Sequence, residues 1–136
     1  MTKIGITGSI ASGKSTFAKM MSGKKYPLFS ADLVVAKLYK EQSFIKTIIR
    51  QYKLQNKSKI KEQIKLLVQK KRNNFKKLEK IIHPLVREKM KTFLKKKNKI
   101  IVLEIPLLVE NKLMRYFDVI IFVGASKKKK NAKIYF

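Results

Sequence analysis

Residues 8 to 15 read GSIASGKS, and their types and spacing suit the binding of a charged ligand. They fit the pattern G-x-x-x-x-G-K-[ST], in which two fixed glycines precede a lysine and a hydroxyl residue. Glycines let the backbone turn so that successive N–H groups point at a polyphosphate, and the N-terminus of a following helix adds positive potential. The pattern predicts ATP phosphates on Gly8, Ala11, Ser12, Gly13, Lys14, Ser15 and Thr16.

The residues around this loop favour the same interpretation. Ile4 and Ile6 indicate a buried strand before the loop, and Phe17, Met20 and Met21 have helical spacing after it. A tight strand-to-helix turn that merely carries a lysine is the alternative. Within the loop, we expect Lys14 to contact the β- and γ-phosphates and the Ser15 hydroxyl to bind Mg²⁺.

Carboxylates are scarce in this chain, with 8 Asp and Glu against 34 Lys and Arg, so the few beside expected strands are informative. Asp32 follows a short strand at 26–29, where a ligand crevice is expected in a parallel α/β sheet. We predict a catalytic role for it, although it could also cap the next helix. Glu104 ends a near-continuous apolar strand, KIIVLE, and is either a Mg²⁺ ligand or an ordinary strand-end charge. Asp118 should open the fourth strand at its amino end, which favours a structural role.

Residues 41–97 show apolar stripes at helical spacing and predict a helical subdomain inserted between the second and third strands. Pro84 is expected in the first turn of a new helix, with His83 at the junction and Arg87 one turn later. On their own these two residues indicate a structural histidine and a solvated arginine.

Composition limits the remaining possibilities. At 136 residues the chain should form one α/β domain. The lack of cysteine and of any long apolar run predicts a soluble, cytoplasmic protein without disulfides. The formal net charge of +26 could indicate a nucleic-acid-binding protein. We favour lysine bias instead, because just four of the basic residues are arginine and the lysines are spread along the expected helices. No specific nucleic-acid or membrane partner is therefore expected.

Four motifs, taken in order, resemble those of dephospho-CoA kinases, which are P-loop proteins related to nucleoside monophosphate kinases. They are TGSIASGKST at 7–16, SAD at 30–32, HPLVR at 83–87 and PLLVE at 106–110. The family usually has D-A-D at the second and PLLFE at the fourth. The resemblance implies phosphorylation of the 3′-hydroxyl of dephospho-CoA by ATP, with Mg²⁺. It also implies that Asp32, His83, Arg87 and Glu110 contact the acceptor.

The resemblance ends near residue 125. Family members continue into a lid helix with arginines and a fifth strand, whereas this chain has no arginine after Arg115 and a run of lysines at 127–130. We therefore expect an incomplete kinase domain over residues 1–126 with four parallel strands and the fifth missing. Residues 127–136 are then expected to be an aberrant tail, from a frameshift or truncation near Ser126. The alternatives are an ATP-binding remnant of impaired activity and another small-molecule P-loop kinase.

Overall fold

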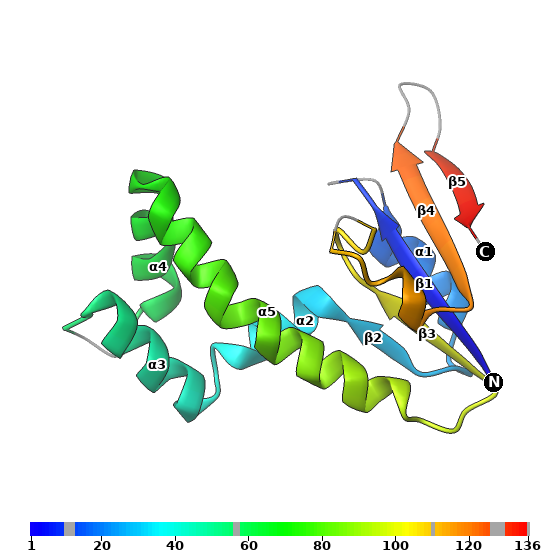
Figure 1. Cartoon of the computed structure of the whole chain (residues 1–136), viewed down its shortest axis with the longest axis horizontal. Helices are drawn as coiled ribbons and strands as arrows, with labels where there is room; N and C mark the ends of the chain where they lie inside the picture. The colour runs from blue at the N-terminus through cyan, green and yellow to red at the C-terminus, as the bar shows by residue number, and fades with distance from the viewer. Residues whose placement is uncertain (10–12, 56–57, 110, 126–129, 136) are drawn as a thin grey trace. The chain divides into compact units, whose positions relative to one another are not determined.

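One sheet organises the part of the chain that carries both termini. The computed structural model describes residues 1–9, 13–55, 58–109, 111–125 and 130–135, with side chains described as far as residue 124. The strands among them are β1 (Thr2–Gly8), β2 (Leu28–Ser30), β3 (Ile100–Glu104), β4 (Val119–Ala125) and β5 (Lys130–Tyr135). Their order is β2-β3-β1-β4-β5, and β1 to β4 are parallel. The expected parallel sheet of four strands is therefore confirmed (Figure 1).

The two faces of the sheet follow from strand alternation, since successive side chains point to opposite faces. Ile4 and Ile6 of β1 share one face with Val102 of β3, and α1 (Lys14–Ser22) covers that face through Ala18. Gly5 and Thr7 lie on the other face, which Leu108 and Phe117 cover. Because both faces are covered, the near-continuous apolar strand β3 is buried from Ile101 to Glu104.

Asp118 joins the amino ends of two strands, as its structural interpretation predicted. The Lys3 backbone N–H donates to Asp118 Oδ2 at 2.8 Å, and the Asp118 N–H donates to the Lys3 carbonyl at 2.9 Å. These reciprocal bonds fix the register of β1 against β4 before Ile4 meets Val119. Asp118 lies at the end of the sheet opposite the phosphate loop.

Residues 33–89 form a second compact unit. Its helical segments come from α2 (Ala31–Leu38), α3 (Gln42–Tyr52), α4 (Ile60–Lys70) and α5 (Arg72–Leu94). The apolar stripes seen in the sequence meet in one core, in which Leu38, Phe44, Ile48, Ile60 and Ile64 are buried. The expected helical substrate subdomain, 41–97, overlaps this unit, and its binding role is taken up below as a proposal.

The structure corrects the expectation for Pro84. It does not start a new helix but lies inside α5, which runs without a break through 23 residues. Ile81 and Ile82 before it and Leu85 and Val86 after it pack against the same core, so both halves of the helix are held in one direction.

The tail is also different from the expectation. Lys130–Tyr135 forms strand β5, which pairs antiparallel with β4 from Ile120↔Tyr135 to Ala125↔Lys130. The expectation of a sheet with only four strands and an aberrant tail is corrected for 130–135, which add a fifth, antiparallel strand, while 127–129 and 136 lie outside the described residues. Pairing with the open edge of β4 supplies backbone hydrogen bonds that local apolar content does not reveal.

Within the described residues, no helix combines the length and the apolar content needed to cross a bilayer.

Candidate active site

The phosphate loop has the surroundings that the sequence predicted. β1 ends at Gly8 and α1 begins at Lys14, with Gly13 as its N-cap. Gly13 has φ 84°, in the left-handed region where a side chain is strained, which explains the glycine at this position. Lys14, Ser15 and Thr16 form the first turn of α1, whose free N–H groups suit an anion. Ala11 and Ser12 lie outside the described residues.

Two predicted metal ligands, 89 residues apart in the sequence, lie in direct contact. Ser15 Oγ donates a hydrogen bond of 2.8 Å to Glu104 Oε1. The strand register explains the contact, because Glu104 pairs with Ile6 and therefore points to the face of the sheet that α1 covers. The end of β3 thus brings a carboxylate to the first turn of the helix after the phosphate loop.

Glu104 is buried, so its carboxylate needs compensating partners. The residue is 2% exposed, and a buried carboxylate is costly unless it is hydrogen-bonded, paired or bound to a cation. In the described part of the chain, no group of three or more His, Cys, Asp or Glu residues could hold a metal by itself. Mg²⁺ does not need such a group, since it is usually held by one or two carboxylates, substrate phosphates and water. Glu104 and Ser15 therefore fit Mg²⁺ that arrives with a nucleotide.

Asp32 lies near the same end of the sheet. Ser30, the last residue of β2, pairs with Glu104, so β2 and β3 end at the same level. Asp32 follows two residues later in the first turn of α2 and is exposed to solvent. α2 begins at Ala31, so Asp32 lies inside the helix and not at its N-cap. A carboxylate there interacts favourably with the helix dipole, and its exposure leaves it available to a ligand.

His83 and Arg87 lie one turn apart on α5, and both are exposed. His83 Nε2 lies 3.7 Å from Glu79 Oε2, one turn earlier on the same helix. The three residues therefore share one face of α5. Their contact with an acceptor remains a proposal.

The segment after β3 contains the fourth motif, and Glu110 in it lies outside the described residues. Leu108 is buried, and its N–H donates to Thr7 Oγ1 at 3.4 Å. A Cβ on Gly5 would lie 2.8 Å from Leu108 Cδ1, so the glycine makes room for this side chain. Gly5 and Thr7 were not predicted from the sequence as contacts of this segment. A glycine inside a strand is the signal that could have indicated the close approach at Gly5.

Fold and site together define a class of protein. A parallel sheet in the order β2-β3-β1-β4, a glycine loop between β1 and α1, and an acid from β3 against the helix serine are typical of P-loop nucleoside-triphosphate-binding proteins.

Comparison with known proteins identifies the family. The family model described as dephospho-CoA kinase matches residues 2–134. The chain is 38% identical over 133 residues to the dephospho-CoA kinase of Bartonella henselae, covering 92% of this chain and 67% of that protein. For the dephospho-CoA kinase of Rickettsia prowazekii the identity is 37% over 137 residues, covering 94% of this chain and 68% of that protein. The chain belongs to the dephospho-CoA kinase family.

Solved structures agree with this assignment. Dephospho-CoA kinase from Campylobacter jejuni superposes with a TM-score of 0.58 at 30% identity, over 77% of this chain and 57% of that one. The protein TT1252 from Thermus thermophilus gives a TM-score of 0.67 at 28% identity, over 89% of this chain and 64% of that one. The chain thus spans about two thirds of the length of its curated relatives.

Proposed function

We propose that this chain transfers the γ-phosphoryl group of ATP to the 3′-hydroxyl of dephospho-CoA, which gives coenzyme A. The observation that carries the proposal is the hydrogen bond between Ser15 and buried Glu104, beside a phosphate loop in a member of this family. The substrates are then small molecules, and we assign no nucleic-acid partner. We also propose a cytoplasmic location, which the lack of cysteine favours.

Residues at different positions in the site have different roles in the proposed reaction. Backbone N–H groups from Gly8 to Thr16 and the Lys14 ammonium bind the phosphates and compensate charge on the transferring group. Glu104 and Ser15 hold Mg²⁺, which neutralises phosphate charge when it is bound. Asp32, exposed at the end of the sheet, orients the acceptor hydroxyl and accepts its proton.

The acceptor also needs contacts outside the phosphate loop. His83 and Arg87 on one face of α5 are cationic or hydrogen-bonding groups that suit its diphosphate, and Glu110 is assigned to the same ligand. These three assignments rest on family resemblance, and the substrate-binding role of the helical unit rests on them.

The test couples calorimetric binding of ATP with Mg²⁺ to an assay of dephospho-CoA phosphorylation. Removing the acceptor base should slow transfer without touching the phosphates, so Asp32→Asn should lower turnover about 100-fold or more and leave the Kd for ATP nearly unchanged. Lys14→Ala should lower both ATP affinity and turnover. Glu62→Gln, a matched loss of one carboxylate charge in the first turn of α4, should change neither.

Each part of the proposal can fail separately. Unchanged turnover in Asp32→Asn would remove Asp32 from catalysis. ATP binding without any phosphorylation of dephospho-CoA would identify a nucleotide-binding protein of impaired activity. If RNA binds tightly even at high salt while ATP does not bind, the chain is a nucleic-acid-binding protein and the loop is not its functional site.

A further inference from the structure

The segment that follows β3, described at residues 105–109 and 111–113, begins against β1 through its backbone. The Ile105 N–H donates to the Ile6 carbonyl at 2.9 Å and extends the pairing of β3 with β1. Beyond it the chain folds back on itself, because Leu113 N–H donates to the Leu108 carbonyl at 3.0 Å. We call residues 105–109 and 111–113 the β3 loop.

Backbone strain in the β3 loop indicates that its shape matters. Leu107 has φ 54° and Lys112 has φ 57°, both in the left-handed region that non-glycine residues rarely adopt. Such conformations persist where the surrounding structure enforces them, and they concentrate at functional sites.

Leu108 supplies the anchor that enforces the shape. Its side chain is 0% exposed and fills the space left by the missing Cβ of Gly5. Its N–H donates to the hydroxyl of Thr7, which is itself 2% exposed. Gly5 and Thr7 are two residues apart on β1, so one face of a single strand provides both the space and the hydrogen bond.

The anchored loop presents apolar side chains to solvent. Leu107 and Val109, on either side of buried Leu108, are 55% and 39% exposed. Ser30 pairs with Glu104, so Asp32 and Pro106 each follow two residues after the ends of neighbouring strands. The β3 loop therefore leaves the sheet next to the segment that carries the assigned acceptor base.

We propose that Thr7 is a positioning residue, whose buried hydroxyl holds the β3 loop so that Leu107 and Val109 contact the uncharged arm of dephospho-CoA. This inference rests on the proposed function and adds a specificity element to the same site. ATP phosphates are not affected, because the phosphate loop leads into α1 on the opposite face of the sheet.

The experiment compares Thr7→Val, Thr7→Ser and Thr2→Val in the full chain. Thr7→Val keeps the side-chain shape and removes the hydroxyl, Thr7→Ser restores a hydroxyl, and Thr2→Val makes the same change at the amino end of the same strand. Amide hydrogen exchange at Leu108 reports the anchor, and calorimetry with dephospho-CoA and with ATP and Mg²⁺ reports its consequence.

We expect Thr7→Val to speed exchange at Leu108 about tenfold and to weaken dephospho-CoA binding about tenfold, with ATP affinity unchanged. Thr7→Ser and Thr2→Val should resemble the wild type in all three measurements. A residue that merely stabilised the sheet would weaken both ligands alike.

A second variant keeps the test independent of folding. Leu107→Asn suits a left-handed backbone and removes the exposed apolar contact, so it should weaken dephospho-CoA binding with no loss of stability. Unchanged dephospho-CoA affinity in both Thr7→Val and Leu107→Asn would overturn the positioning role and leave the proposed function intact. A wild-type chain that binds ATP but no dephospho-CoA would overturn both.

Discussion

Ser15 and Glu104 are in direct contact, but different features of the chain position each of them. The serine ends the glycine loop, while the carboxylate is placed by the alternation of β3. A carboxylate can accept more hydrogen bonds than the one that Ser15 donates, because each of its two oxygens can accept more than one. Cation binding uses that capacity and lowers the cost of keeping the charge inside the protein.

This arrangement predicts the behaviour of Glu104→Gln. The amide keeps the size of the side chain but loses the negative charge. The factor by which Mg²⁺ lowers the Kd for ATP should therefore be about tenfold smaller than in the wild type. The measurement is the ratio of ATP Kd values in EDTA and in Mg²⁺. Glu62→Gln is the charge-matched control, and an unchanged ratio in Glu104→Gln would assign Mg²⁺ to other groups.

Gly5 allows a prediction about stability. A Cβ at this position would lie 2.8 Å from Leu108 Cδ1 and 3.0 Å from two atoms of the Phe117 ring. Overpacking of this kind should make Gly5→Ala less stable by about 1–3 kcal/mol in urea unfolding. In a double-mutant cycle with Leu108→Ala, the two costs should add to more than the cost of the double variant. Strict additivity would show that the two positions do not touch.

At the scale of elements, Pro84 is the exception within α5. Proline has no N–H to donate to the carbonyl one turn earlier and is about 3 kcal/mol less favourable than alanine in a helix interior. Because Pro84 is exposed, no packing offsets this cost at the side chain itself. Pro84→Ala should therefore raise the free energy of unfolding by about 1–3 kcal/mol, measured by urea unfolding followed by circular dichroism.

An exposed substitution on the same helix is the control for this change. Lys91→Ala should shift stability by less than about 0.5 kcal/mol. A Pro84→Ala variant that is less stable than the wild type would mean that the helix uses the local distortion that proline imposes.

The elements that could be predicted from the sequence are those with strong local signals. Ile4 and Ile6 indicated β1, and the glycine pattern indicated the loop. The apolar residues at helical spacing around Phe44 and Ile64 indicated a helical core. The prediction that Pro84 starts a new helix was wrong. Proline is common in a first helical turn, and the local sequence does not show that the residues on both sides of Pro84 pack against one core. β5 was missed because an edge strand depends on the backbone of its neighbour.

The site shows the same division between local and distant information. Lys14 and Ser15 could be predicted from the spacing of the motif alone. The hydrogen bond between Leu108 and Thr7, by contrast, joins residues 101 positions apart. No periodicity in either segment points to the other. Glu104 could be named as a candidate from its place at a strand end, but its burial and its hydrogen bond to Ser15 depend on the register of three strands.

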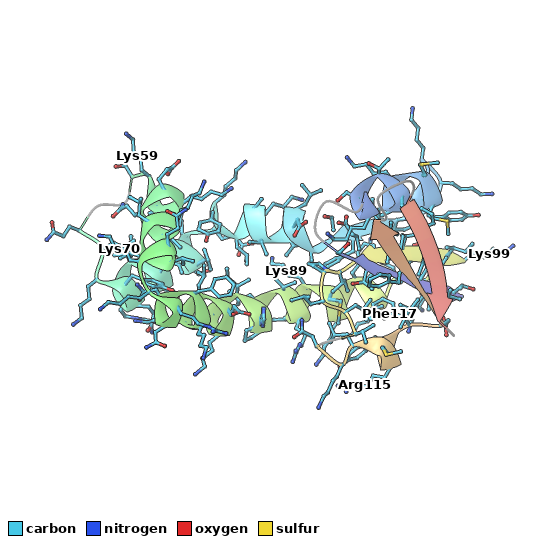
Figure 2. The ribbon with its side chains drawn as sticks, turned by 90° about the horizontal axis from the view of Figure 1, so that it is seen from above. Lys59, Lys70, Lys89, Lys99, Arg115 and Phe117 are labelled. Atoms are coloured by element: carbon cyan, nitrogen blue, oxygen red, sulfur yellow. The ribbon has the colours of Figure 1, made fainter. Side chains whose placement is uncertain are left out.

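At the scale of the whole molecule, charge dominates. The formal net charge is +26, and Figure 2 shows nitrogen-tipped side chains, Lys59, Lys70 and Lys99 among them, along the surface of the described elements. In the described residues, a lysine–carboxylate ion pair joins Lys89 to Glu41 at 3.0 Å. Like charges on a compact surface repel one another and oppose folding.

Salt should therefore stabilise the protein. Raising KCl from about 20 to about 200 mM shortens the Debye length to below about 10 Å and should raise the Tm by about 3–6 °C. Differential scanning calorimetry measures the shift, and an equal molality of sorbitol is the uncharged control. A Tm that falls with KCl would show that attractive pairs outweigh repulsion.

The central position of β1 has a consequence for how the chain is made. Lys3 bonds to Asp118 across 115 residues, and the other neighbour of β1 begins at Ile100. A ribosome therefore releases the first strand long before either partner strand exists, with Ile4 and Ile6 uncovered throughout. The pairing of β1 can be completed only after residues 100–104 and 119–123 have left the ribosome, so the emerging polypeptide exposes an unpaired apolar strand until then and is prone to aggregate.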